Sequence, residues 1–266
     1  MSRHTSRARR RAAAGSAAVR RAAACVLASG GLDSAVLLGE ALREYRTVQP
    51  VYVRTGLRWE AGELRALRRF LRAIRSHRLR PLVVLDLPMR EVYGDHWSTT
   101  GRVPGFHETD ASVYIPGRNI MLFSKAAAFC ALRRLPVLLL GILSANPFPD
   151  GSPAFLRAME RALARGLAAP IRLRAPFRRL TKARVIHRGR GLPLQLTLSC
   201  STPRRGLHCG LCVKCGERAK AFLRAGVPDP TAYADRRYLG RTWLVRRPLR
   251  YAAGHNRRKV SPVSSA

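Results

Sequence analysis

The chain has 266 residues and a formal net charge of +35, from 50 Lys and Arg against 15 Asp and Glu. Its hydrophobic content of 47% is typical of a globular protein and excludes a disordered chain. The most apolar run, residues 135–143, is about as long as a strand, whereas a membrane span needs about 20 residues. We therefore expect a soluble, cytoplasmic protein without a membrane contact.

Both ends of the chain are basic. Residues 1–24 contain seven Arg and no acidic residue, and residues 236–266 contain nine Arg or Lys and no acidic residue. The first segment is interpreted as a disordered basic arm, with an organellar transit peptide as the alternative. The charge predicts attraction to nucleic acid or another polyanion, although coding bias in a GC-rich genome also produces Arg enrichment.

Two βαβ units are predicted after this arm. Apolar runs at residues 23–29, 48–54 and 81–87 have the length of buried strands. Residues 33–45 and 62–77 are amphipathic with helical spacing. Strands separated by helices of this length predict right-handed crossovers and a parallel sheet.

A long polar segment, residues 88–113, interrupts this pattern. A loop of that length in a compact domain is usually functional. Beyond it we expect helix 120–134, strand 136–142, helix 151–167 and strand 171–177. The order predicts a doubly wound α/β fold, which we assign to residues 25–190.

A glycine turn separates the first strand from the first helix. It consists of Ser29, Gly30, Gly31, Leu32, Asp33 and Ser34. Ligands of doubly wound folds bind at this end of the strands, and the free N–H groups of the following helix favour an anion. Asp33 would repel phosphate unless a cation stood between them, which predicts Mg²⁺ with a nucleotide. A plain turn in which Asp33 caps the helix is the alternative.

Four of the six cysteines lie together near the end of the chain. They are Cys200, Cys209, Cys212 and Cys215. Their C-x8-C-x2-C-x2-C spacing favours tetrahedral thiolate ligation of Zn²⁺ in a structural site, with disulfides or an iron–sulfur cluster as alternatives. A helix over residues 217–226 is predicted to follow. We assign residues 191–228 to this zinc module and residues 229–266 to a basic tail.

Three more residues near these features receive plain structural interpretations. His208, beside the cysteines, is interpreted as a surface residue because four thiols already complete the ligand set. Cys25 and Cys130 lie in apolar segments and are interpreted as small core residues.

Four motifs occur in an order that resembles one enzyme family. They are SGGLDSA from Ser29, PGRN at residues 116–119, LTKA at residues 180–183, and SC at residues 199–200 followed by CGLCVKCGERAKAF. The first resembles the PP-loop of the N-type ATP pyrophosphatases, and the set resembles the 7-cyano-7-deazaguanine synthases (QueC/ExsB-like). The resemblance covers about residues 25–225. It implies an adenine nucleotide α-hydrolase-like fold that uses ATP, Mg²⁺ and Zn²⁺.

The same resemblance implies an ATP-dependent C–N ligase of queuosine and 7-deazapurine biosynthesis. Such an enzyme adenylates 7-carboxy-7-deazaguanine, lets ammonia displace AMP, and removes the amide oxygen with a second ATP to give 7-cyano-7-deazaguanine (preQ0). The glycine turn would bind ATP, and Asp33, Arg118 and Lys182 would serve the chemistry, the last two by contacting phosphate or the substrate carboxylate. The ammonia source and a homodimer stay open.

Two segments depart from the family pattern. In residues 54–63 the family's Gln-Arg-His type stretch is altered, with Trp59 about where His is expected. Residues 144–153 keep Pro149 and Asp150 but lose a Cys-Arg pair. Because both are expected near the substrate, a divergent paralogue that adenylates another carboxylate or stops at the amide is one alternative. A basic nucleic-acid-associated protein with the same fold is another.

Overall fold

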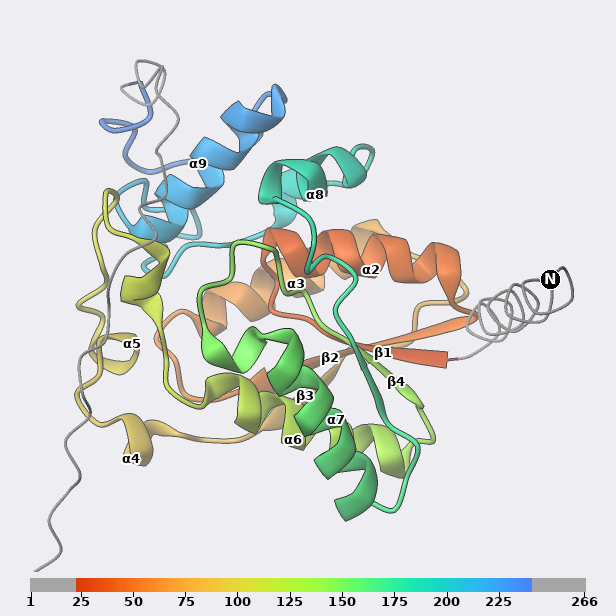
Figure 1. Ribbon diagram of the computed structural model, residues 1–266. Coiled ribbons are helices and arrows are strands. Elements are labelled where there is room, and N and C mark those ends of the chain that lie inside the picture. Colours follow the sequence, from red (N-terminus) through yellow and green to blue (C-terminus); the bar gives the residue numbers. More distant parts are fainter. Residues whose placement is uncertain (1–22, 241–266) are drawn as a thin grey trace, which may run out of the picture.

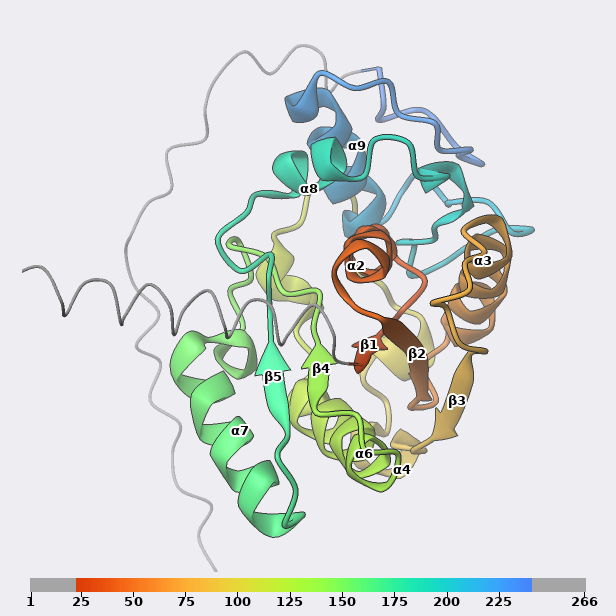
Figure 2. The same cartoon turned by 90° about the vertical axis from the view of Figure 1, so that its right-hand side faces the viewer.

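The computed structural model describes residues 23–240, which are built around one parallel sheet (Figures 1 and 2). Its strands are β1 (Ala23–Leu27), β2 (Thr47–Arg54), β3 (Val83–Asp86), β4 (Val137–Leu139) and β5 (Arg172–Arg174). They are ordered β3-β2-β1-β4-β5, and all neighbouring pairs are parallel. The chain winds outward from β1 to β3 and returns to β4, so the doubly wound prediction is confirmed. The topological switch point lies between β1 and β4.

Helices cover both faces of the sheet (Figure 2). One face carries α2 (Leu32–Glu44), α3 (Glu60–Ala73), α8 (Lys182–Arg188) and α9 (Val213–Ala225), and the other carries α6 (Arg118–Leu132) and α7 (Pro153–Gly166). Alternate residues of β1 belong to the two resulting cores: Ala24 and Val26 pack toward α2, and Cys25 packs toward α6. Burial on both sides explains why β1 reads as a continuous apolar run.

The cysteines outside the cluster are core residues, as predicted. Cys25 on β1 and Cys130 on α6 are both fully buried and belong to the same apolar cluster. Their neighbours are aliphatic and aromatic side chains, so each acts as a small apolar residue that fills the space between sheet and helix.

The polar segment 88–113 contains three short helices that the sequence did not predict. They are α4 (Arg90–Tyr93), α5 (Trp97–Thr100) and a 3-10 turn at Asp110–Val113. The His96 side chain accepts a hydrogen bond from the Ser98 N–H at the start of α5, and Gly101, at φ +85°, ends it in the left-handed conformation. Helices of four residues complete barely one turn, so hydrophobic periodicity cannot reveal them.

The last helix begins earlier than predicted. We expected it to start at Glu217, after the cysteines, but α9 begins at Val213 and includes Cys215 in its first turn. The helix ends at Gly226 as predicted, because this glycine adopts the left-handed conformation at φ +61°.

The predictions for the two basic ends fall largely outside the described residues. Residues 1–22 and 241–266 lie beyond them. Between residues 23 and 240, no helix has both the length and the apolar character that crossing a membrane requires.

Candidate functional site

The glycine turn (residues 29–34) joins β1 to α2 at the switch point. Gly30 takes φ +77°, and a Cβ there would overlap the backbone carbonyl of Glu63, so only glycine fits. The Ser34 hydroxyl donates to the Gly31 carbonyl at 3.1 Å and accepts the Ser29 N–H at 3.2 Å. These bonds close the turn. Because it directly follows β1, the turn lies at the carboxyl edge of the sheet.

Asp33 does not cap α2. The N-cap position is Gly31, which makes no side-chain capping bond, so the alternative in which Asp33 closes the helix is wrong. One carboxylate oxygen of Asp33 lies 3.3 Å from Lys182 Nζ, while Oδ1 is buried and has no hydrogen-bond partner within residues 23–240. An unpartnered buried carboxylate oxygen fits a cation ligand, as the prediction of Mg²⁺ requires.

Lys182 is the first residue of α8 and lies between two carboxylates. It contacts Asp33 on one side and donates a hydrogen bond to Glu217 on the other. Burial alone would lower the pKa of Lys182, but the two carboxylates raise it above its ordinary value, so the ammonium group stays charged. Thr181 caps α8 by accepting the Arg184 N–H at 3.3 Å, which fixes the helix start that positions Lys182.

Two charged residues of α9 complete this group and were not predicted. Lys214 Nζ donates to Glu217 at 2.8 Å and lies 3.9 Å from Asp110. Asp33, Lys182, Glu217 and Lys214 therefore form a four-charge cluster that links α2, α8 and α9. The only sequence signal for Lys214 and Glu217 was their position beside the metal-spaced cysteines, and that position does not record which element the helix faces.

Arg118 opens α6 and lines the same cavity as this cluster. Gly117 precedes it in the left-handed conformation at φ +70°, and the Arg118 Nε is buried without a hydrogen-bond partner in the described chain. The next residue, Asn119, donates its side-chain amide to Asp150 Oδ1 at 3.0 Å. Asp150 thus anchors the start of α6.

A buried carboxylate lies on the sheet side of the site. Glu63 accepts a hydrogen bond from the Tyr52 hydroxyl at 2.9 Å, and burial raises the pKa of Glu63 to about 7 against the opposing effects of Arg118 and Tyr52. Trp59, in residues 54–63, stacks against Trp97, with ring centroids 5.4 Å apart and planes 11° from parallel. Arg58 points elsewhere and donates to the Thr100 carbonyl.

One cavity of about 340 Å³ lies at the centre of this site. Its wall includes the glycine turn, Arg118, the four-charge cluster and Glu63. A second aromatic pair, Tyr114 and Phe148, lines it with centroids 5.1 Å apart. Three buried polar atoms without partners in the described residues belong to cavity-lining side chains: Asp33 Oδ1, Trp97 Nε1 and Arg118 Nε. The cavity therefore offers cations, carboxylates, two N–H donors without partners in the described residues, and flat apolar walls to one ligand.

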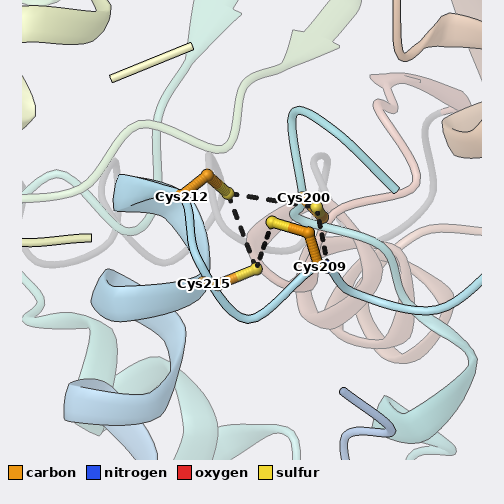
Figure 3. A group of neighbouring side chains, drawn as sticks. All are labelled: Cys200, Cys209, Cys212 and Cys215. Atoms are coloured by element: carbon orange, nitrogen blue, oxygen red, sulfur yellow. Dashed lines mark hydrogen bonds between the residues drawn. The ribbon is translucent and has the colours of Figure 1, made fainter. Parts of the chain in front are cut away.

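The four cysteines converge at the start of α9 (Figure 3). The sulfurs lie within 4.8 Å of one another, with Cys200–Cys212 and Cys209–Cys215 at 3.9 Å and Cys212–Cys215 at 3.5 Å. A tetrahedral site with metal–sulfur bonds of about 2.3 Å has edges of about 3.8 Å. The arrangement fits one metal ion held by four thiolates.

Backbone N–H groups surround the sulfurs. Thr202 and Cys209 donate to Cys200 Sγ at 3.3 and 3.2 Å, Leu211 donates to Cys209 Sγ, and Gly210 donates to Cys215 Sγ. N–H donors of this kind stabilise thiolates and orient them toward a shared ion. The donor set thus favours a closed structural site over four neutral thiols.

His208 is not a surface residue, which corrects our interpretation. Its side chain is buried, and Nε2 accepts the Ser199 N–H at 3.1 Å. Burial and the neighbouring Arg218 lower the pKa of His208 to about 3, so the imidazole is neutral and acts as an acceptor. Sequence reasoning missed this role because the partner is a backbone group nine residues away.

Arg218, a buried residue of α9, binds this helix to the neighbouring segment through hydrogen bonds. Its guanidinium donates to Thr231, to Thr197 at 2.9 Å, to Ser199 and to the Leu194 carbonyl, and the residue is 1% exposed. These bonds tie α9 to the segment that carries Cys200. They leave Lys214 and Glu217 as the charges of this helix that face the cavity.

A protein-family model and two relatives of known name indicate the same enzyme family. The family model for the queuosine biosynthesis protein QueC matches residues 23–226. A 7-cyano-7-deazaguanine synthase from Anaeromyxobacter dehalogenans is 37% identical over 228 residues, covering 79% of this chain and 94% of the relative. One from Methanothermobacter thermautotrophicus is 32% identical, covering 79% and 98%. Among solved structures, the U34-tRNA thiolase NcsA of Methanococcus maripaludis, with its 4Fe-4S cluster, covers 79% of this chain and 68% of its own at 12% identity, with a TM-score of 0.43.

Proposed function

The chain belongs to the QueC family of queuosine biosynthesis proteins, and from this premise we propose how its residues carry out an ATP-dependent synthesis of 7-cyano-7-deazaguanine. The observation that carries the proposal is the contact of Lys182 with Asp33 in the cavity that the glycine turn closes. Lys182 thus supplies a charged ammonium group beside the N-terminus of α2, a position that favours a phosphate group.

The first step needs a leaving group on an unreactive carboxylate. The substrate carboxylate attacks the α-phosphorus of ATP, the bond to the pyrophosphate breaks, and an acyl adenylate forms. The α2 N-terminus and the glycine turn hold the departing pyrophosphate, and Lys182 stabilises the negative charge that develops on it. Mg²⁺, held by Asp33, would supply the neutralising charge between this carboxylate and the phosphates.

Ammonia then attacks the acyl carbon, releases AMP and leaves the amide. The amide oxygen then attacks the α-phosphorus of a second ATP, and pyrophosphate leaves again. Loss of AMP and protons from the adenylated amide gives the nitrile. Glu63 lines the cavity with a pKa near 7, so it exchanges protons readily at neutral pH. We propose that it accepts a proton during the nitrogen steps.

The aromatic pairs are proposed to recognise the deazapurine. Trp59 with Trp97 and Tyr114 with Phe148 supply flat apolar walls to the cavity, and a planar heterocycle gains most from such surfaces. Trp97 Nε1–H and Arg118 Nε–H, which have no partner in the part of the chain that the structure describes, would donate to the oxygen atoms of this substrate.

The cysteines are proposed to hold Zn²⁺. When bound, it supplies a fixed four-thiolate anchor and no open coordination position for a reactant. Cys212 immediately precedes α9 and Cys215 lies in its first turn, so the anchor fixes the position from which Lys214 and Glu217 enter the cavity.

The test is direct. Purified full-length protein is incubated with Mg²⁺, ATP, ammonium and 7-carboxy-7-deazaguanine, and AMP and the deazapurine products are followed by mass spectrometry. We expect two AMP for each nitrile formed. AMP with accumulation of amide would instead indicate a paralogue that stops early, and no AMP above the substrate-free rate would refute the proposal.

A further inference from the structure

A second hollow, of about 660 Å³, lies between the C-terminal end of α3 and the segment that leads into β3. We call it the basic groove, because its lining includes the exposed side chains of Arg68, Arg72, Arg75, His77 and Arg80. In a right-handed crossover α3 runs antiparallel to the strands, so this end of it lies at the amino edge of the sheet. The ligand cavity opens at the carboxyl edge, and the basic groove is therefore a separate feature.

The charge of the basic groove is uncompensated. No Asp or Glu occurs between Glu63 and Asp86, a stretch that contains seven Arg. None of the ion pairs found among residues 23–240 involves an arginine of the groove. Arg68 and Arg72 are four residues apart on one helix face, where like charges destabilise a helix. This repulsion is relieved when an anion enters the groove.

The shape and spacing favour an extended anion. Arg68 and Arg72 are separated by about 6 Å along the helix axis, and Arg75 and Arg80 continue the charge past the helix end. A strand of duplex nucleic acid places one phosphate every 3.4 Å or so along its axis, so a row of this length faces several phosphates. A single small anion would leave most of these charges unpaired.

The lining also indicates what part of the nucleic acid is contacted. No Phe, Tyr or Trp is among the residues that line the groove, whereas proteins that bind single strands stack bases on such side chains. We propose that the basic groove binds the phosphate backbone of a base-paired nucleic acid, independently of its sequence. Its interaction is independent of the ligase chemistry proposed above.

The experiment measures the salt dependence of binding. Full-length protein is titrated against a fluorescein-labelled 20-base-pair DNA duplex at several salt concentrations, and log K is plotted against log salt. Because each phosphate contact contributes about 0.9 to the slope, we expect the triple variant R68Q/R72Q/R75Q to lower its magnitude by about 2 to 3. At the lowest salt, we expect its affinity to fall at least about tenfold.

A matched triple variant separates the groove from the overall charge. R157Q/R161Q/R165Q removes the same three charges from exposed positions on α7, on the other face of the sheet (Figure 2). We expect it to change the slope by less than 1, and both variants to keep the ligase rate and melting temperature of the parent. Equal losses in the two variants would refute the groove and assign binding to net charge. A larger loss of binding to phosphatidylserine vesicles than to the duplex would also refute it, in favour of a membrane surface.

Discussion

At the scale of single residues, we expect substitution of Lys182 to have the greatest effect on catalysis. It is buried between Asp33 and Glu217, and its position at the start of α8 is fixed by a capped helix. Because the side chain is already held in one position before the ligand binds, no free energy is spent on ordering it. Such preorganised charges give strong electrostatic stabilisation.

We expect K182M to lower kcat/KM for ATP at least about 100-fold, because it removes the positive charge that stabilises the negative charge developing on pyrophosphate. Initial rates of AMP release measure this. The control is K125M on α6, whose side chain does not line the cavity and which should stay within about twofold of the parent. Similar losses in both variants would contradict a specific role for Lys182.

Glu63 predicts a pH dependence of stability. Its folded pKa of about 7 lies above the ordinary value of 4.5, so the folded state binds the proton more tightly than the unfolded state. Stability from this group is fully present below pH 4.5 and is lost as pH rises through 7, by about 3 kcal/mol at most. E63Q cannot lose a proton. Urea unfolding should therefore show that the free energy of unfolding of E63Q, relative to that of the parent, is higher at pH 8 than at pH 5. The same difference between variant and parent at both pH values would contradict the raised pKa.

At the scale of elements, the glycine turn depends on close backbone approach. Gly30 and Gly191 both take positive φ, +77° and +85°, but a Cβ at Gly30 meets the Glu63 backbone while at Gly191 it meets nothing within 4 Å. The two positions thus separate conformational strain from steric overlap.

We expect G191A to cost about 1 kcal/mol of unfolding free energy, from strain alone, and G30A to cost clearly more. G30A should also weaken ATP binding, because the turn must move to admit the methyl group. Denaturant unfolding and calorimetric titration of ATP measure the two effects. Equal costs at both positions would show that the turn tolerates a side chain.

The cysteine module and the cavity are joined through α9. We expect the parent to carry about one zinc per chain and C212S to carry almost none, with a melting temperature at least about 5 °C lower. ATP affinity should fall too, since Lys214 and Glu217 lie on the same helix. Metal analysis of C130S, a buried cysteine far from the cluster in sequence, provides the control and should match the parent. Zinc retained in C212S would contradict the four-thiolate site.

At the scale of the whole molecule, one cavity connects both halves of the sheet. Residues from β2, α2, α6, α8 and α9 line it. A ligand bound there bridges elements far apart in the sequence, so it stabilises the fold as a unit.

We expect ATP with Mg²⁺ at about 100 times its dissociation constant to add about 2.7 kcal/mol, which raises the melting temperature by roughly 5 to 10 °C. Differential scanning fluorimetry of the parent and K182M measures this, and K182M should lose most of the shift. An equal shift with ATP and EDTA would contradict the role of Asp33 in holding Mg²⁺.

The sequence by itself determined the features that are local or periodic. The doubly wound order followed from apolar runs alternating with amphipathic helices, and the glycine turn and the x2 cysteine spacing need only a few consecutive residues to be read. These patterns constrain the structure directly because backbone geometry and thiolate ligation act over short stretches of chain.

The tertiary structure decided which distant groups meet. Only packing brings Glu217 to Lys182, 35 residues away, or buries His208 against the Ser199 backbone. Only the folded cavity leaves Asp33 Oδ1 and Arg118 Nε without partners among residues 23–240. Such contacts depend on how α8 and α9 pack over α2, and no local periodicity records that packing. The fold therefore decides that Glu63, Lys214 and Glu217 line the cavity. Asp33, Arg118 and Lys182 lie in short motifs, so consecutive residues were enough to predict them.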